Sequence, residues 1–153
     1  MNKIYIISAL VLLSCSNTEI KKTDNTKIEH FTSTESEKLG FPFSDGTIVN
    51  NIIYVSGQVG NFPGTTELIS GGIGSETTQA LNNIKSILDQ AGSSSDNIFK
   101  CLCMLADIND YPEMNSAYRM FFDENKKPSR STFAGSGLAL GAKIEIECWA
   151  VKK

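Results

Sequence analysis

Apolar and polar residues alternate near the end of the chain. Over residues 144–151 every second residue is small or aliphatic, and the residues between them include two glutamates and a tryptophan. A period of two is typical of a strand with one buried and one open face. Another extended stretch starts at Pro128, because proline biases the chain away from helix. The pattern predicts two strands joined by a glycine-rich connection.

A hairpin is predicted earlier in the chain. Residues 47–49 and 52–59 are rich in β-branched side chains and are separated by Asn50-Asn51. Asparagine tolerates the positive φ that tight turns require. Gly57 interrupts the second run. It marks either a β-bulge or a place where the backbone comes close to a ligand or another chain, and the pattern leaves both open.

Helical periodicity marks two segments. After Ser75, a favourable N-cap, apolar residues form one stripe over about sixteen residues, and Gly92 offers a left-handed terminating position. Residues 110–113 resemble a capping box with a proline in the first turn, and a second apolar stripe follows them. Between the helices, residues 98–106 form a nearly continuous apolar run, typical of a strand covered on both faces.

These elements follow the order β-β-α-β-α-β-β. We therefore predict a single α+β domain in which a mixed sheet is backed by two helices on one face. The other face carries Glu145, Glu147 and Trp149 together with apolar groups of neighbouring strands. Because such a face is rarely left in water, we expect it to be buried against other subunits. Sites in such assemblies tend to lie in clefts between chains.

The start of the chain has a different character. Residues 1–15 contain one lysine and an apolar run of about ten residues, shorter than the roughly twenty that span a bilayer. The run ends in Leu-Leu-Ser-Cys, which resembles a bacterial lipobox; a plain secretory signal is the alternative. We predict lipidation of Cys15 and an exported protein anchored to a membrane of the cell envelope. Residues 16–38 are polar and predict a flexible tether, so the folded domain is expected over residues 39–153.

Composition narrows the possible chemistry. The chain has 153 residues, a net charge of −3 and a single histidine, His30, in the predicted tether. No basic surface for nucleic acid is expected, and a serine or cysteine nucleophile would lack its histidine base. No cysteine and histidine cluster has metal-ligand spacing. Since three thiols cannot all pair, we expect Cys101, Cys103 and Cys148 to be small, free core residues.

Two charged residues on the last two strands are candidates for catalysis. A guanidinium such as that of Arg130 grips a small carboxylate with two parallel hydrogen bonds, and a glutamate such as Glu145 activates water. An ordinary surface ion pair between them is the alternative. Asn115, near the start of the second helix, is most simply interpreted as a solvated side chain.

Six stretches, in order, resemble the RidA/YjgF family of reactive-intermediate imine deaminases. They are YVSGQ at 54–58, TQALNNIK at 78–85, AGSS at 91–94, NSAY at 115–118 followed by Phe121-Phe122, PSRST at 128–132 and IEIE at 144–147. The resemblance covers residues 41–153. It implies a chorismate-mutase-like fold and a homotrimer with its sites between subunits.

The resemblance also implies an activity that needs no cofactor and no metal. The family hydrolyses 2-imino and 2-enamino acids, such as 2-iminobutanoate and 2-iminopropanoate, to 2-keto acids and ammonia. Arg130 would hold the substrate carboxylate and Glu145 would position and activate water. The remaining pocket residues that the resemblance implies are Asn115, Gly57, Ser131, Thr132 and Phe43.

Phe43 departs from the family pattern, which usually has tyrosine there, so one hydroxyl is missing. This departure keeps a second hypothesis open: a non-catalytic module that binds a small carboxylate metabolite at the cell envelope. Translation inhibition and endoribonuclease activity, names attached to the wider family, fit least, because the chain is acidic and lacks a catalytic histidine.

Overall fold

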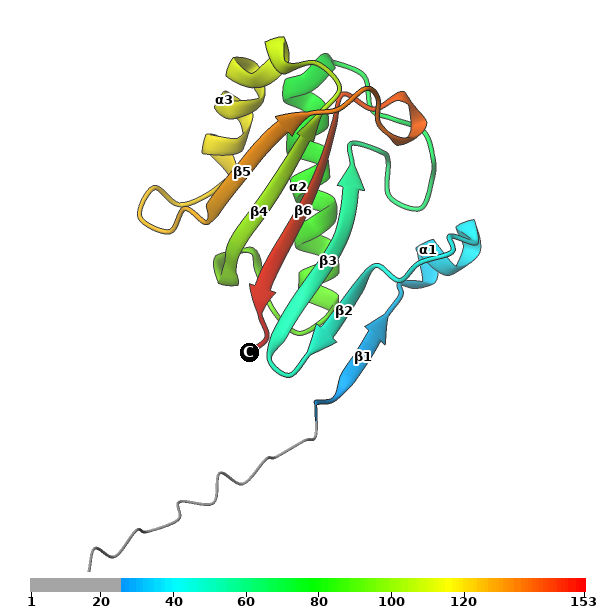
Figure 1. The fold of residues 1–153 in the computed structure, drawn as a ribbon. Coiled ribbons are helices and arrows are strands. Elements are labelled where there is room, and N and C mark those ends of the chain that lie inside the picture. Colours follow the sequence, from blue (N-terminus) through cyan, green and yellow to red (C-terminus); the bar gives the residue numbers. More distant parts are fainter. Residues whose placement is uncertain (1–25) are drawn as a thin grey trace, which may run out of the picture.

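The computed structural model describes residues 26–153 and contains a six-stranded mixed sheet with helices (Figure 1). The strands are β1 (Ile28–Phe31), β2 (Gly46–Val49), β3 (Ile52–Val59), β4 (Ile98–Leu105), β5 (Ser129–Ala134) and β6 (Ile144–Val151). The helices are α1 (Thr34–Leu39), α2 (Gly72–Gln90) and α3 (Tyr111–Phe121), with short 3₁₀ turns at Ser95–Asn97, Ile108–Asp110 and Ala139–Gly141.

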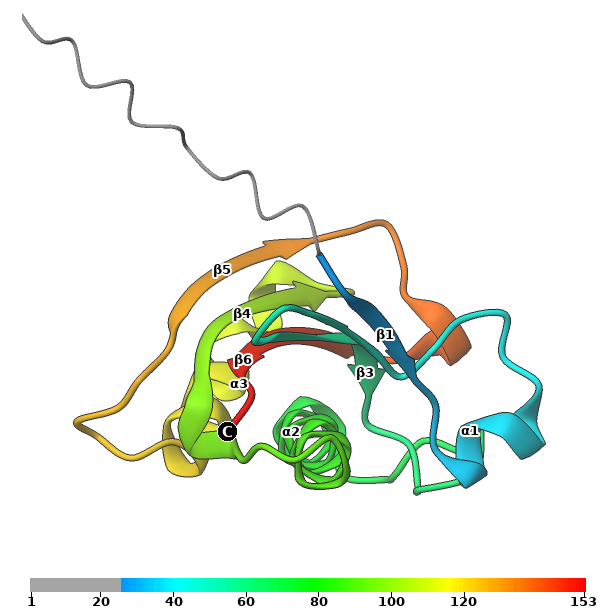
Figure 2. The same cartoon turned by 90° about the horizontal axis from the view of Figure 1, so that it is seen from below.

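The strand order in the sheet is β1-β2-β3-β6-β4-β5. All neighbouring strands are antiparallel except β4 and β5, which are parallel because α3 returns the chain between them. Helices α2 and α3 lie against the same face of the sheet, as Figure 2 shows. The predicted α+β fold with two helices on one face is therefore confirmed.

The core lies between the sheet and α2. Ile144, Ile146, Cys148 and Ala150 of β6 are fully buried, and so are Leu81, Ile84 and Leu88 on the apolar stripe of α2. Burying each aliphatic side chain of this size stabilises the fold by about 1.5–3 kcal/mol. The period of two in β6 thus results from one face that packs on the helix.

Strand β4 differs from its prediction as a strand covered on both faces. Its burial alternates: Cys101, Cys103 and Leu105 are buried, whereas Phe99 is 40% exposed and Leu102 and Met104 are half-buried. Within one chain the helices cover only one face of β4. We call the opposite side of the sheet, which carries Phe99, Leu102, Met104, Glu145, Glu147 and Trp149, the open face.

Part of the predicted tether is folded. Strand β1 pairs with β2, and α1 is capped by Ser33 at its start and by Gly40, in a left-handed conformation, at its end. Asp45 holds this segment, since its buried carboxylate accepts hydrogen bonds from the Ser33 N–H at 2.7 Å and the Ser36 hydroxyl at 2.6 Å. The prediction of a flexible tether is thus wrong for residues 28–38. His30, which was placed in that tether, lies on β1.

The signal segment and Cys15 lie outside the described residues. Among residues 26–153, no helix combines the length and the apolarity that crossing a membrane requires.

Two helix starts differ from their predictions. Helix α2 begins at Gly72 after a left-handed Gly71, before Ser75, and no side chain caps it. Asp110 makes no capping hydrogen bond, so the capping box does not form. Its carboxylate instead lies 3.8 Å from the Lys143 ammonium.

Two of the three cysteines expected to be free form a disulfide. Cys101 on β4 and Cys148 on β6 are directly opposite each other, with Cα atoms 4.2 Å apart. Cys103, two residues further along β4, stays free and buried. The prediction failed because an odd number of thiols leaves one unpaired but still allows the other two to form a disulfide. The sequence also did not show that β4 and β6 are neighbours in the sheet.

Candidate active site

Arg130 lies on the edge strand β5, and its side chain reaches residues of α3. Its Nη2 atom donates to the Asn115 Oδ1 atom at 2.7 Å and to the Tyr111 hydroxyl at 3.1 Å. The centre of the guanidinium lies 4.5 Å from the ring centre of Tyr118, within cation–π distance. Three residues of one helix thus fix the guanidinium plane.

Some of the Arg130 donors are left for a ligand. A guanidinium has five N–H groups, and besides the two bonds of Nη2 there is one long contact, 3.9 Å, from Nη1 to the Met114 sulfur. The arginine faces a hollow of about 350 Å³ that Asn115 and Tyr118 also line. We call this the arginine hollow. Asn115 is therefore an Arg130 partner rather than a solvated side chain.

Buried polar groups lie beneath Arg130. The hydroxyls of Tyr118 and Thr132 are buried and have no hydrogen-bond partner within residues 26–153. Burial raises the pKa of the Cys103 thiol to about 11, and the nearby Arg130 charge only partly opposes this rise. The pKa of Tyr118 is also raised, chiefly by burial. Near neutral pH both groups are uncharged, so Cys103 is a poor nucleophile.

Glu145 lies on the open face of β6. Burial raises the pKa of its carboxyl, and the neighbouring Glu147 carboxylate raises it further. Gly57 on β3 makes room for this side chain, because a Cβ atom at Gly57 would overlap the Glu145 carboxylate. The β3–β6 register also shifts between Val55 and Gln58. Both interpretations of Gly57, a bulge and a close approach, therefore apply.

Glu145 borders a second hollow of about 430 Å³, which we call the glutamate hollow. It lies where β3 extends beyond its pairing with β2, and Gly57, Phe43, Leu39, Ile87 and Leu140 are among its lining residues. The Phe43 ring stacks on Phe41, with ring centres 5.2 Å apart and planes 7° from parallel. Phe43 is 52% exposed and presents only an apolar ring to the hollow.

Arg130 and Glu145 point to opposite faces of the sheet within one chain. Strand β4 lies between their strands and pairs with both: Cys101 is opposite Arg130, and Met104 is opposite Glu145. Cys101 is buried under the helices, whereas Met104 lies on the open face. The two side chains therefore belong to separate half-sites, and neither forms an ion pair within the described residues.

The other expected site residues divide between the two faces. Asn115 and Thr132 lie with Arg130, and Gly57 and Phe43 lie with Glu145. Ser131 lines neither hollow; its hydroxyl accepts a hydrogen bond from the Lys100 ammonium at 3.0 Å. Within one chain these groups therefore do not come together in a single site.

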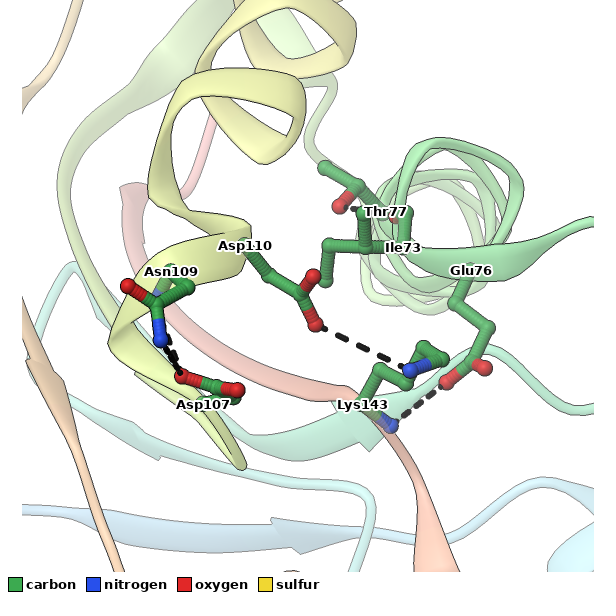
Figure 3. A network of polar contacts seen from close by, with 7 residues as sticks. All are labelled: Ile73, Glu76, Thr77, Asp107, Asn109, Asp110 and Lys143. Carbon is green, nitrogen blue, oxygen red and sulfur yellow. Dashed lines mark hydrogen bonds and ion pairs between the residues drawn. The ribbon is translucent and has the colours of Figure 1, made fainter.

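A polar network that the sequence pattern did not predict fixes the start of β6 (Figure 3). The buried Glu76 carboxylate on α2 accepts a hydrogen bond at 2.8 Å from the backbone N–H of Lys143, two residues before Glu145. The Lys143 ammonium in turn lies near Asp110. The signal for this network in the sequence was Glu76 itself, which lies four residues before Ala80 on the apolar stripe of α2. It was also the only charged residue on that buried stripe.

Tyr111 and Tyr118, which hold Arg130, were also missed as site residues. In the helical pattern Tyr118 counts as a core residue, and only the packing of β5 against α3 shows its contact with the guanidinium. Within residues 26–153, no three His, Cys, Asp or Glu side chains gather closely enough to hold a metal ion.

The family model for endoribonuclease L-PSP matches residues 36–152. A human 2-iminobutanoate/2-iminopropanoate deaminase is 40% identical over 111 residues, covering 72% of this chain and 80% of its own length. A RutC family protein of Pyrococcus abyssi is 37% identical over 123 residues, covering 80% of this chain and 95% of its own.

Solved structures agree with this relationship. The crystal structure of yeast Mmf1 matches with a TM-score of 0.74 at 32% identity, covering 83% of this chain and 100% of that one. The YjgF gene product of E. coli matches with a TM-score of 0.68 at 34% identity, covering 73% of this chain and 89% of that one. The chain therefore belongs to the RidA/YjgF family, to which the endoribonuclease L-PSP model corresponds.

Proposed function

We propose that the protein hydrolyses small 2-imino and 2-enamino acids to 2-keto acids and ammonia. The observation that carries the proposal is the pair of half-sites: an arginine oriented by Asn115 and Tyr111, and a half-buried glutamate with a raised pKa beside Gly57. The names of relatives about 40% identical, 2-iminobutanoate/2-iminopropanoate deaminases, agree with this chemistry.

The proposed reaction needs only water and one carboxylate. Water attacks the carbon of the protonated imine while one of its protons passes to Glu145, which gives a neutral carbinolamine. Glu145 returns that proton to the amine, the C–N bond breaks as C=O forms, and the hydroxyl proton leaves with ammonia as ammonium. The C=N bond is replaced by C=O, ammonia leaves, and no electron is exchanged. The raised pKa of Glu145 suits a group that must both accept and return a proton near neutral pH.

The site is proposed to form between two chains of a homotrimer. Each half-site borders its own hollow, and the two point away from each other in one chain. The open face also exposes aromatic surface, including Tyr54, Phe99 and Phe133. Apolar area of this kind supports burial against neighbouring copies.

The test is complementation between two inactive variants. Arg130→Ala and Glu145→Ala proteins are each expected to release no ammonia above the spontaneous rate from imines that an amino-acid oxidase generates in situ. Co-expressed, they form mixed trimers in which about a quarter of the sites combine an intact arginine with an intact glutamate. We expect about that fraction of wild-type activity.

Two results would contradict the proposal. If the wild-type trimer does not accelerate ammonia release over buffer, the protein is not an imine deaminase. If the wild type is active but the mixed variants stay inactive, each site lies within one chain and the shared-site geometry fails.

Export and lipid anchoring at Cys15 are part of the proposal. They rest on the lipobox-like sequence at residues 12–15 and gain support from the Cys101–Cys148 disulfide, because structural disulfides persist mainly in oxidising compartments outside the cytosol. We expect a radioactive fatty acid supplied to growing cells to label the wild-type protein, and we expect this labelling to be lost in Cys15→Ser.

A second candidate function is the non-catalytic binding of a small carboxylate metabolite. Phe43 favours it, since a phenyl ring lines the glutamate hollow where the family usually has a phenol. Binding that depends on Arg130, is indifferent to Glu145→Ala and occurs without turnover would select this function. Ribonuclease activity has less support, because His30, on β1, lines neither hollow.

A further inference from the structure

The arginine hollow is strongly cationic. Arg119 and Lys127 line it together with Arg130, and none of its lining residues is an aspartate or glutamate. Arg119 forms no ion pair within residues 26–153. Lys127 lies 3.6 Å from Glu124, but both side chains are exposed, so this pair contributes little. Three positive charges thus share one hollow of about 350 Å³.

The binding of a substrate with a single carboxylate does not account for three positive charges in this hollow. The carboxylate of a small 2-imino acid needs one bidentate partner, and Arg130 is already oriented for that task by Asn115 and Tyr111. Arg119 follows Tyr118, whose ring packs against Arg130, and Lys127 precedes Pro128 and the β5 strand. Arg119 therefore lies on the helix that orients Arg130, and Lys127 lies in the loop that leads into β5.

We propose that Arg119 and Lys127 recognise a second carboxylate, so that the protein prefers 2-imino acids derived from dicarboxylic amino acids. This inference rests on the proposed function and names its substrate class. Arg130 takes the carboxylate next to the imine carbon. The side-chain carboxylate, one or two methylene groups away, is bound by Arg119 and Lys127.

Electrostatic steering is the competing explanation, and it predicts a different result. Cations that only attract anions favour a dianion over a monoanion through its larger charge, and salt screens this attraction. A specific contact to a second carboxylate keeps the preference for the dicarboxylate at high ionic strength. The ratio between dicarboxylate and monocarboxylate binding at high ionic strength therefore separates the two explanations.

The experiment measures binding of the stable keto acids 2-oxoglutarate and 2-oxobutanoate to the purified, assembled protein by isothermal titration calorimetry at high ionic strength. We expect 2-oxoglutarate to bind about tenfold more tightly or better, as a charge-assisted hydrogen bond supplies. In Arg119→Gln/Lys127→Gln this preference should be lost. Lys126→Gln is the matched control, because Lys126 pairs with Asp96 and does not line the hollow; it should keep the preference.

Turnover of the corresponding imines, measured in parallel, keeps the two proposals apart. The inference is overturned if the wild type binds both keto acids with equal affinity. It is also overturned if the double variant loses the same factor of affinity for both, even if imines are hydrolysed. A 2-oxoglutarate preference that depends on Arg119 and Lys127, without hydrolysis of any imine, supports the second-carboxylate site and contradicts the deaminase function.

Discussion

At the scale of single residues, Gly57 and Glu145 depend on each other through space. The β3 backbone at Gly57 comes so close to the Glu145 carboxylate that only a hydrogen atom fits between them. The carboxylate thereby reaches the glutamate hollow and remains half-buried, which raises its pKa. One glycine therefore sets both the position and the proton affinity of the proposed base.

The first prediction concerns this contact. Gly57→Ala should lower kcat/KM for imine hydrolysis by at least tenfold, since its methyl group displaces the Glu145 side chain and misplacing a catalytic group is costly. Circular dichroism should show an unchanged fold. Gly135→Ala is the control, because a Cβ there meets no atom closer than 3.8 Å. Normal activity in Gly57→Ala would show that Glu145 does not need this position.

The second prediction concerns pH. The base form of Glu145 is lost as the pH falls through its raised pKa, so kcat/KM should decline on the acid side of neutrality. Glu147→Gln removes the neighbouring charge while its amide oxygen can still accept the hydrogen bond from the Trp149 indole. The acid limb should therefore move to lower pH in this variant, whereas Glu124→Gln should leave it in place.

The raised pKa has a consequence for stability as well. The native state binds the Glu145 proton more tightly than the unfolded chain, whose value is near 4.5. The free energy of unfolding therefore falls as the pH rises from that value through the raised pKa. Glu145→Gln should be more stable than the wild type at neutral pH, and this difference should shrink at low pH. Equal stability at every pH would contradict this account.

At the scale of elements, the structure divides into parts that the sequence pattern could predict and parts that it could not. Helices α2 and α3 and strand β6 each bury one side, so their periodicity carries the signal. Strand β1 and helix α1 are short and polar, and tertiary hydrogen bonds to Asp45 hold them. No local pattern contains those bonds.

The candidate site shows the same division. The residue pattern supplied Arg130 and Glu145 as candidates, and the resemblance added Asn115 and the role of each group. Their placement, however, depends on the register of β5, β4 and β6. Register is a pairing between distant segments, and a shift of one residue reverses the face of each side chain. The opposite orientation of Arg130 and Glu145 therefore could not be derived from the sequence.

The fourth prediction concerns the disulfide between β4 and β6. It closes a loop with a sequence separation of 47 residues, so its loss should lower the free energy of unfolding by about 2–4 kcal/mol. Chemical denaturation of Cys101→Ala/Cys148→Ala should show this loss. A reductant should destabilise the wild type and leave the double variant unaffected. Wild-type stability that is insensitive to reductant would contradict a structural disulfide.

At the scale of the whole molecule, the proposed trimer connects burial of the open face with catalysis. Phe99 lies edge-on to Trp149 with ring centres 6.4 Å apart and is 40% exposed, so a charge at this position costs little in an isolated chain. In a trimer buried through this face, the same charge would lose its water without gaining a partner.

Phe99→Glu should therefore yield folded monomers by light scattering. Because the half-sites of Arg130 and Glu145 then no longer meet, the monomers should be inactive although both residues are intact. Met120→Glu, at an 88% exposed position on α3, should remain trimeric and active. Monomers of Phe99→Glu that retain full activity would separate assembly from catalysis and place the reaction within one chain.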